Sequence, residues 1–439
     1  ELRGGARPGA PVRIGLLAVG SDRRWNVRQA IVWARLFGVS GAVIETVELS
    51  DGLGVATAGV RVRRGQSRRC GVCGRRCSLY DRGEGRRRWR APDLGTTIAF
   101  VEAEAPRVSC PKHGVVVARV PWARHDSRFT RDFEDQCAWL AVHVSKTTLA
   151  EMARIAWRTV GRIIGRVVEE RSAEVDRLDG LSKIGIDEVS FRRGQRYLTV
   201  VVNHETARVV WVEEGRDDAT LDRFFDRLGP ARSSALRFVT ADGALWIKSV
   251  LARRCPQATV CMDPFHVVAW ANEALDQVRR QVWNEARRAG HTNLASALSG
   301  ARFALRKNPE NLTQNQTAKL ADIARINRPL YRAYLLKEQL REVFRLPFRA
   351  GVALLEHWIA WASRSRLVPF VKVARRIRAH RSTIAPALQY GLSNARVESL
   401  NSRIRLLTRI AFGFHTSRPL IAMVLLALGG LCPPLPGRS

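Results

Sequence analysis

The spacing of hydrophobic and polar residues changes along the chain. From Lys183 the period is two, and the runs KIGIDEV, YLTVVVN and RVVWVEE predict three strands separated by the turn-like stretches RRGQ and HETA. ATLDRFFDRLG, LRFVTAD, LWIKSVLARRC and ATVCMD then predict helix, strand, helix and strand in that order. A three-stranded meander followed by alternating helices and strands indicates a mixed α/β sheet.

Before and after these predicted strands in the sequence, apolar residues recur at helical spacing. Residues 265–390 are almost wholly helical in pattern, and upstream LAEMARIA and RTVGRIIGRVVEE form two short amphipathic segments that meet near Ala156-Trp157. This pair predicts a helix-turn-helix. Its second helix has an arginine face opposite an apolar one, which suits a helix in the major groove. The arginines are Arg158, Arg162 and Arg166, and the inward residues are Val160, Ile163, Ile164 and Val167. An ordinary amphipathic pair with a solvated arginine face is the alternative.

Four cysteines fall within the segment between residues 70 and 110. Cys70 and Cys73 form a C-x-x-C, Cys110 and His113 form a C-x-x-H, and the intervening TTIAFVEAEA predicts a strand. Two such knuckles supply the four soft ligands of a zinc ribbon, with Cys77 as a substitute ligand. Reduced cysteines without a metal are the alternative. Upstream, VIETVELSDGLGVATAGVRVR alternates around Asp51-Gly52 and predicts a hairpin.

Charge narrows the choice of partner. The 439 residues include 73 Lys and Arg against 40 Asp and Glu, a formal net charge of +33. An excess of this size fits nucleic acid best, with a membrane surface next and a merely basic surface as the third reading. The longest apolar run, 419–430, is about half of the roughly 20 residues a membrane helix needs. We therefore expect no membrane span and a cytoplasmic protein with reduced thiols.

Two aspartates end strands of the predicted sheet. Asp187 closes the first strand, with Glu188 beside it, and Asp242 closes the fourth in RFVTADGA. In a meander of this kind the first and fourth strands are neighbours, so the two carboxylates should lie side by side. Like charges at close range favour a shared cation, and hard oxygen ligands select Mg²⁺ or Mn²⁺. Glu188 points to the opposite face of the strand.

A third carboxylate lies on a helix near the C-terminus. In LSNARVESLNSRIRLLTR, Val397, Leu400, Ile404 and Leu407 form an apolar stripe. Asn394, Glu398, Asn401 and Arg405 form a second stripe at spacings of four, three and four. Such a face can approach a metal and a phosphate backbone together. The alternative is that Asn394 caps the helix and Glu398 pairs with a nearby arginine.

The chain resembles bacterial insertion-sequence transposases of the DDE type, specifically the ISL3 family, from about Arg28 to the C-terminus. The motifs that carry the resemblance are GIDE, TADGA, DPFHVV, KNPENLT, LYRAYLLKE and LSNARVESLNSRIRLLTRIAFGF. The order of zinc ribbon, helix-turn-helix and split sheet is also similar. Ala395 departs from the family pattern, in which glycine is expected, and the first 25 or so residues have no clear counterpart.

The resemblance implies an RNase H-like catalytic fold interrupted by a large helical insertion. Asp187, Asp242 and Glu398 would be the catalytic triad and would hold two Mg²⁺ or Mn²⁺ ions for DNA cleavage and strand transfer. Zn²⁺ would be structural. Arg158, Arg162, Arg166, Asn394, Asn401 and Arg405 are the candidate DNA contacts. Glu188, Asp263 and His266 are secondary candidates at the site.

The expected organisation is multidomain α/β. The segments are 1–27, a poorly defined N-terminus; 28–125, hairpin and zinc ribbon; 126–180, helix-turn-helix; 181–266 with 391–430, the catalytic domain; and 267–390, the helical insertion. The expected partners are transposon-end and target DNA, with a homo-oligomer in the synaptic complex at the bacterial nucleoid. A transposase-derived regulator without catalysis and a metal-dependent nuclease are the rival functions. Sequence-specific end binding followed by cleavage would discriminate among the three.

Overall fold

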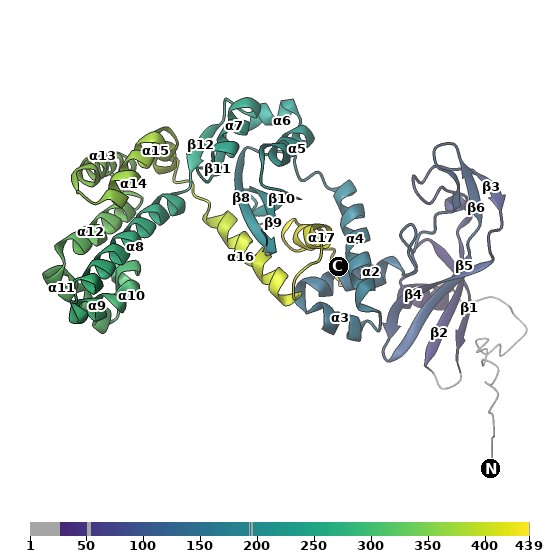
Figure 1. The fold of residues 1–439 in the computed structure, drawn as a ribbon. Helices are drawn as coiled ribbons and strands as arrows, with labels where there is room; N and C mark the ends of the chain where they lie inside the picture. The colour runs from purple at the N-terminus through teal and green to yellow at the C-terminus, as the bar shows by residue number, and fades with distance from the viewer. Residues whose placement is uncertain (1–26, 51–53, 193, 195, 439) are drawn as a thin grey trace, which may run out of the picture. The chain divides into compact units, whose positions relative to one another are not determined.

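A computed structural model describes residues 27–50, 54–192, 194 and 196–438. The chain divides into two compact units, Glu1–Val175 with Leu431–Ser439, and Asp176–Gly430 (Figure 1). The turn expected at Asp51-Gly52 lies outside the described residues, as does the N-terminal segment up to residue 26. The predicted mixed α/β architecture is confirmed in its main features, with mixed sheets and many helices.

The first unit is built on a four-stranded sheet with the order β1-β2-β5-β4. Helix α1 (Val27–Leu36) precedes β1 (Ala42–Leu49), β2 (Val55–Val62), β4 (Arg86–Leu94) and β5 (Thr97–Glu104). The antiparallel β1–β2 pair confirms the predicted hairpin, and the strand predicted at TTIAFVEAEA is β5. β5 pairs parallel to β2 and antiparallel to β4. Trp89 and Trp122 pack edge to face in the core beneath this sheet, with ring centroids 5.6 Å apart.

A smaller sheet and three helices complete the first unit. The short helix η1 (Arg64–Gln66) leads to the sheet of β3 (Ser78–Asp81), β6 (Arg107–Cys110) and β7 (Gly114–Val117), in the order β3-β6-β7. The helices are α2 (Arg131–His143), α3 (Lys146–Met152) and α4 (Trp157–Glu174). The apolar residues predicted to face inward on α4 are all buried.

The second unit contains a five-stranded mixed sheet with the order β10-β9-β8-β11-β12. Its strands are β8 (Lys183–Arg192), β9 (Arg196–Asn203), β10 (Arg208–Glu214), β11 (Phe238–Ala241) and β12 (Thr259–Met262). β8, β9 and β10 form an antiparallel meander, whereas β11 runs parallel to both β8 and β12. The prediction that the first and fourth strands of this sheet are neighbours is therefore confirmed.

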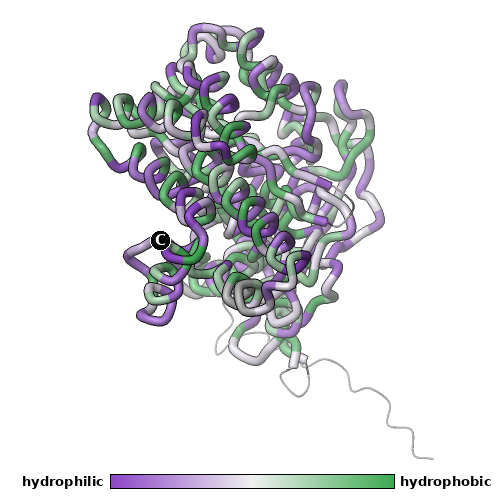
Figure 2. The backbone as a smooth tube through the Cα atoms, turned by 60° about the vertical axis from the view of Figure 1, so that its left-hand side comes forward, coloured by the Kyte–Doolittle hydropathy of each residue, from purple (hydrophilic) through white to green (hydrophobic). Residues whose placement is uncertain are grey.

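Helices cover both faces of this sheet. α5 (Asp218–Leu228) and α7 (Leu245–Arg254) bury one face and α16 (Ala395–Ile410) and α17 (Ser417–Leu428) bury the other, while α6 (Pro230–Ala235) follows α5. Hydrophobic and hydrophilic residues alternate along the helices in the pattern expected of amphipathic elements (Figure 2). Among the described residues no helix is long and apolar enough to cross a membrane.

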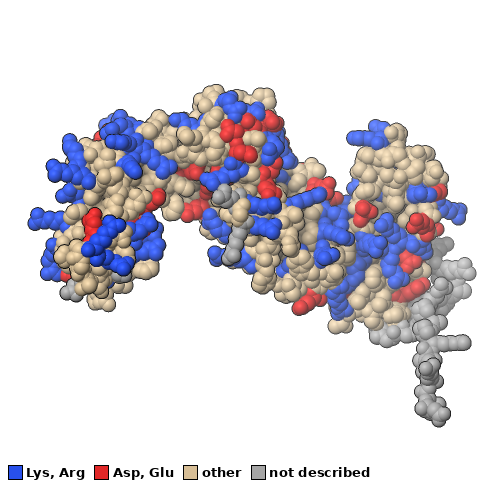
Figure 3. Space-filling view, in the orientation of Figure 1, with Lys and Arg blue, Asp and Glu red and all other residues tan. Residues whose placement is uncertain are grey.

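Between β12 and α16 the chain forms a helical bundle with its own core around Trp358 and Phe370. The helices are α8 (Pro264–Arg288), α9 (Thr292–Ser299), α10 (Arg302–Arg306), η2 (Pro309–Asn311), α11 (Gln314–Ile326), α12 (Arg328–Val343), α13 (Phe348–Arg364), α14 (Val368–Ala379) and α15 (Arg381–Tyr390). Among the charged side chains of the bundle, Lys and Arg are more prominent than Asp and Glu in the view of Figure 3. The helical stretch predicted for residues 265–390 is therefore present.

Candidate active site

The register between β8 and β11 brings Asp187 and Asp242 together. Thr240 lies opposite Gly185, so the same register carried two residues further places Asp242 beside Asp187. Burial raises the pKa of the Asp187 carboxyl above its ordinary value, and the nearby carboxylates of Asp242 and Asp263 add to the increase. Two carboxylates at one sheet edge, one of them largely desolvated, form a site that favours a bound cation.

Glu188 lies on the other face of β8, as the alternation of strand residues predicts. Ile184 and Ile186, which share its face, pack in the core under α5 and α7, whereas Gly185 faces α16. Glu188 forms an ion pair with Arg216, and burial raises the pKa of its carboxyl to about 7. The structure therefore separates the two adjacent acids, with Asp187 toward α16 and Glu188 toward α7.

Helix α16 packs tightly on the strand that carries Asp187. Asn401 donates its Nδ2 hydrogen to Asp187 Oδ2 at 2.7 Å, and Asn394 Nδ2 donates to the Ile186 carbonyl at 3.3 Å. Glycine at 185 makes this approach possible, because a Cβ there would lie 2.4 Å from Val397 Cγ2. The close packing fixes both the depth and the rotation of α16 against β8.

Glu398 lies between these two contacts on α16. It follows Asn394 by four residues and precedes Asn401 by three, so all three share one helix face, and that face meets β8. The Glu398 side chain is half-buried, and among the described residues none forms a hydrogen bond or ion pair with its carboxylate. Among the described residues, the carboxylate oxygens of Glu398, Asp187 and Asp242 are not as close to one another as the ligand atoms of the cysteine–histidine group, which lie within 4.8 Å.

The donors at this edge of the sheet suit a hard divalent cation. Asn401 Oδ1 is buried and lacks a hydrogen-bond partner in the described part of the chain, although the same amide is bonded to Asp187. An unsatisfied buried oxygen beside partly desolvated carboxylates costs free energy unless a cation or water satisfies it. All of these donors are oxygens, the ligands that Mg²⁺ and Mn²⁺ prefer. The residues present therefore fit a divalent ion.

The two asparagines at α16 are buried, whereas the sequence predicts that they contact DNA. Asn394 and Asn401 were expected to contact DNA, but they are 1% and 0% exposed. Their amides are bonded within the protein, since Asn394 also donates its backbone N–H to Asp263 Oδ1 at 3.0 Å. A buried amide with internal partners positions α16 and does not reach a nucleic acid. Arg405, on the same stripe, is exposed.

A buried hydrogen-bonded chain supports the N-terminus of α16. His204 Nε2 lies 2.6 Å from Thr240 Oγ1, and Thr240 donates to Asn394 Oδ1. Burial lowers the pKa of His204 to about 4, with the positive charges of Arg396 and Lys183 contributing, so the imidazole is neutral near pH 7. Sequence reasoning missed His204 and Thr240, although Thr240 stands inside the TADGA motif.

Asp263 and His266 follow β12, as expected from their order in the chain. Asp263 is 2% exposed and caps α8 as well as accepting from the Asn394 backbone. His266 Nε2 lies 3.9 Å from Asp263 Oδ2, and a proton on this imidazole would act to lower the pKa of Asp187. Asp263 thus ties the start of α16 to the sheet, while His266 lies at the edge of the carboxylate cluster.

The cysteine–histidine group in the first unit is preassembled for a metal. The ligand atoms of Cys70, Cys73, Cys110 and His113 all lie within 4.8 Å of one another. The Cys73 and Cys110 sulfurs are 3.8 Å apart, and His113 Nδ1 lies 3.6 Å from the sulfurs of Cys70 and Cys110. Tetrahedral Zn²⁺ with bonds of about 2.3 Å to sulfur places two sulfurs about 3.8 Å apart. These four residues fit Zn²⁺.

The thiol environment is consistent with this assignment. Burial acts to raise the pKa of Cys110, but backbone N–H groups of Lys112 and His113 and the His113 side chain lower it to about 6. A thiol that ionises readily is a good zinc ligand. Cys77 is outside the group, and its sulfur lies 3.3 Å from the Arg75 carbonyl oxygen instead.

Comparisons with known proteins identify the family. A sequence model of ISL3 DDE transposases, described as transposase, matches residues 184–424, and a helix-turn-helix domain of transposase family ISL3 matches 118–168. The zinc-finger of transposases IS204, IS1001, IS1096 and IS1165 matches 66–113. The chain belongs to the ISL3 family of insertion-sequence transposases. It is therefore a DDE-type DNA transposase, as predicted, with a zinc ribbon and a helix-turn-helix ahead of the catalytic region.

Known transposases are similar in sequence to this chain over most of its length. The transposase for insertion sequence element IS1557 of Mycobacterium tuberculosis, in strains CDC 1551 / Oshkosh and H37Rv, is 50% identical over 437 residues, which covers 94% of this chain and 98% of the relative. The transposase for IS1001 of Bordetella parapertussis is 26% identical over 352 residues, or 79% of this chain and 85% of the relative.

In this ISL3 transposase the helix-turn-helix is formed by α3 and α4. Ser145 caps α3 by accepting the Thr148 N–H at 3.1 Å, and α4 begins at Trp157, at the predicted junction. Arg158 and Arg162 are exposed on α4, as a DNA contact requires. Lys146 Nζ lies 3.3 Å from the ring centroid of Trp157, a cation–π contact between the two helices of the motif.

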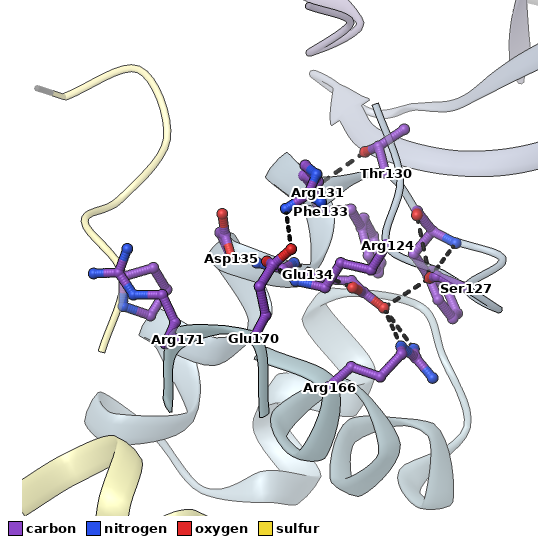
Figure 4. Close-up of polar contacts among 12 residues, drawn as sticks. Arg124, Ser127, Thr130, Arg131, Phe133, Glu134, Asp135, Arg166, Glu170 and Arg171 are labelled. Atoms are coloured by element: carbon purple, nitrogen blue, oxygen red, sulfur yellow. Dashed lines mark hydrogen bonds and ion pairs between the residues drawn. The ribbon is translucent and has the colours of Figure 1, made fainter. Parts of the chain in front are cut away.

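Arg166 differs from the other two arginines. Its Nε and Nη2 lie 2.8 and 2.5 Å from Glu134 Oε1 on α2 (Figure 4). Glu134 is fully buried and also accepts from Arg124 and Ser127. Arg166 therefore forms an internal ion pair instead of standing free on the arginine face as expected, because a buried carboxylate requires its donors.

Proposed function

We propose that this ISL3 transposase binds the terminal inverted repeats of its insertion sequence and carries out divalent-metal-dependent end cleavage and strand transfer. Asp187, Asp242 and Glu398 would be the catalytic carboxylates. The sheet order, with β8 central and parallel to β11, supports an RNase H-like catalytic fold in which α8–α15 form a helical insertion. The observation that carries the proposal is the β8–β11 register, which sets Asp242 beside Asp187 of β8. Helix α16, which includes Glu398, packs against the same strand.

The residues of the site would have two kinds of role, metal binding and positioning. Asp187, Asp242 and Glu398 would hold Mg²⁺ or Mn²⁺, which when bound supplies a Lewis acid for the attacking and leaving oxygens of phosphoryl transfer. Asn401 orients the Asp187 carboxylate, and Asn394 with Thr240 and Asp263 fixes the start of α16. A rigid sheet edge with a tightly docked helix keeps these carboxylates preorganised.

DNA recognition would belong to the first unit. The exposed Arg158 and Arg162 on α4 would contact the inverted repeats, and bound Zn²⁺ would fix the ribbon formed by the two knuckles. Arg405 on α16 would contact DNA at the catalytic carboxylates. Because two transposon ends must be joined in one reaction, the protein would act as a homo-oligomer on DNA of the nucleoid.

A cleavage and strand-transfer assay tests the proposal. Labelled DNA carrying the element's own ends is incubated with Mg²⁺ or Mn²⁺ and with wild type, Asp187→Asn, Asp242→Asn or Glu398→Gln. We expect end nicking and strand transfer by wild type, and binding without cleavage by the three variants. Glu188→Gln is the matched control, since this acid faces α7 and we expect cleavage within about threefold of wild type. Binding without cleavage by wild type in either metal would favour the regulator instead, and cleavage without end preference would favour a nuclease.

A further inference from the structure

Phe412 has an exposure and a backbone conformation that packing does not explain. Its side chain is 97% exposed, and its φ of 54° lies in the left-handed region. Gly413 N–H bonds to the Thr408 carbonyl at 2.8 Å and Phe412 N–H to the Arg409 carbonyl at 3.0 Å, so α16 ends in a Schellman motif. Phenylalanine thus occupies the position where glycine is preferred. The ring gains no buried contact in return for this unfavourable backbone conformation.

The segment around Phe412 is held in place. Phe414, two residues later, packs against the core formed by α16, α17 and the sheet. Arg192 on β8 donates to the His415 carbonyl at 3.1 Å. The exposure of Phe412 therefore belongs to a fixed turn that points one aromatic ring inward and the other into solvent.

The surroundings of Phe412 are basic. No Asp or Glu follows Glu398 in the sequence. Glu398, Ser402, Arg405 and Arg409 recur at spacings of four, three and four, so they line one face of α16 that leads from Glu398 to Phe412. Neither arginine forms an ion pair within the described part of the chain, nor does the exposed Arg418, which follows Phe412 by six residues. Free guanidinium groups around an exposed ring are the features with which proteins hold nucleic acid strands.

The length of α16 sets where the ring would meet DNA. Phe412 follows Glu398 by 412 − 398 = 14 residues. α16 ends at Ile410, 12 residues after Glu398, so this part of the helix spans about 18 Å at 1.5 Å per residue, and Phe412 follows in the closing turn. A helix α16 that lies along the duplex would set the ring about six base steps from the carboxylate, because stacked bases are about 3.4 Å apart.

We propose that Phe412 is a base-stacking wedge, which inserts into the transposon end or its flank about six base pairs from the phosphate held at Glu398. Arg405 and Arg409 would follow the DNA backbone between the two points. This inference rests on the proposed function, and it adds a residue that deforms the substrate. Insertion of apolar side chains between base steps kinks or unstacks DNA.

A second copy of this chain is the competing occupant. Leu406 and Ile410 are also exposed, so the end of α16 offers an apolar strip. A two-fold contact through this strip would set the same arginines of both copies against each other. Like charges in an interface oppose association, whereas DNA neutralises them. The charge pattern therefore favours DNA.

The test compares Phe412→Gly with wild type, Phe412→Trp and Phe303→Ala. Glycine removes the ring and suits the left-handed position, so the variant should fold with equal or higher thermal stability. Tryptophan keeps an aromatic platform. Phe303 is a 70% exposed phenylalanine on α10, away from the α16 stripe in sequence, and is the matched control. The probe is a duplex of the element's end with 2-aminopurine placed singly at steps three to nine on each side of the cleavage position.

We expect wild type, Phe412→Trp and Phe303→Ala to raise 2-aminopurine fluorescence at one or two steps near the sixth, which reports unstacking. Phe412→Gly should lose this signal and bind the end about 5- to 150-fold more weakly. An unchanged fluorescence pattern with Phe412→Gly overturns the wedge, even where wild type binds and cleaves. A loss of self-association of the DNA-free protein, without a change in fluorescence, assigns the ring to the second copy instead. Failure of wild type to bind any end duplex overturns the proposed function and the wedge together.

Discussion

Replacing Glu134 with glutamine should loosen the packing of α2 against α4, the second helix of the helix-turn-helix. Glu134 Oε1 accepts from Ser127 Oγ at 2.7 Å and from the Arg166 guanidinium, while Oε2 accepts from Arg124 Nη1 at 3.1 Å. Glutamine has nearly the same shape but carries no charge, and its amide turns hydrogens toward one of these donors. The substitution therefore removes the charge at the centre of the network shown in Figure 4 without leaving a cavity.

The expected loss of stability follows from burial. The side chains of Glu134 and Arg124 are 0% and 5% exposed, and breaking such a buried pair from one side costs about 3–5 kcal/mol. Two features place the loss near the lower end. Arg124 keeps Asp135 and Glu170 at 2.6 and 2.7 Å, and Arg166 is 24% exposed and can turn toward water. We predict a loss of about 3 kcal/mol.

Hydrogen exchange of the zinc-loaded chain measures this loss locally. A change of 3 kcal/mol corresponds to about 150-fold faster exchange of the protected amides in α2 and α4. Amides of β8 and β9 in the other unit should be unaffected. Glu169→Gln, at an exposed neighbour of Glu170, is the control and should change exchange by less than about twofold. Less than about fivefold faster exchange in Glu134→Gln would refute the reasoning, because the buried pair would then contribute little.

Three further outcomes are expected. Cys110→Ser should lose bound Zn²⁺, measured by elemental analysis after dialysis, whereas Cys77→Ser should retain it; equal zinc in both would contradict the assigned ligands. Burial lowers the pKa of His204 to about 4, so between pH 4 and 6.5 the unfolded chain binds more protons than the folded chain. The stability that the neutral imidazole contributes is therefore complete above pH 6.5 and is lost as the pH falls to 4. His204→Gln should flatten the pH dependence of the free energy of unfolding of the second unit, obtained from urea titrations, by up to about 3 kcal/mol over this window. An unchanged pH profile would contradict it. Asn401→Ala should lower kcat for end cleavage about 10- to 100-fold with little change in end binding, and an equal loss of binding would contradict a positioning role.

The features that follow a local period could be predicted from the sequence. Alternating residues in β8, β9 and β10 indicated a meander, and the order of elements then made β8 and β11 neighbours. The inward face of α4 was also evident, because Val160 and Val167 repeat at helical spacing. The zinc knuckles can be predicted because their ligands lie in two pairs, each three residues apart.

The roles of individual polar residues depended on distant partners. Arg166 shares a helix stripe with Arg158 and Arg162, and the buried Glu134 that binds it lies 32 residues away. Asn401 meets Asp187 across 214 residues and Asn394 meets Ile186 across 208. Spacing along one helix identifies which residues share a face, but it does not show which part of that face is covered. For this reason the sequence predicts DNA contacts for the amides of Asn394 and Asn401, whereas both side chains are buried.

A metal-specificity switch at Asp242 examines whether the carboxylates hold the catalytic ion. Asp242→Cys replaces a hard oxygen ligand with a thiolate, which Mg²⁺ accepts poorly and Mn²⁺ tolerates better. End cleavage is measured in each metal, with Glu188→Cys as the matched control. The site described here predicts loss of cleavage in Mg²⁺ with partial recovery in Mn²⁺ for Asp242→Cys, and no such preference for Glu188→Cys. Equal cleavage by Asp242→Cys in the two metals at the wild-type rate would contradict a metal-binding role for Asp242.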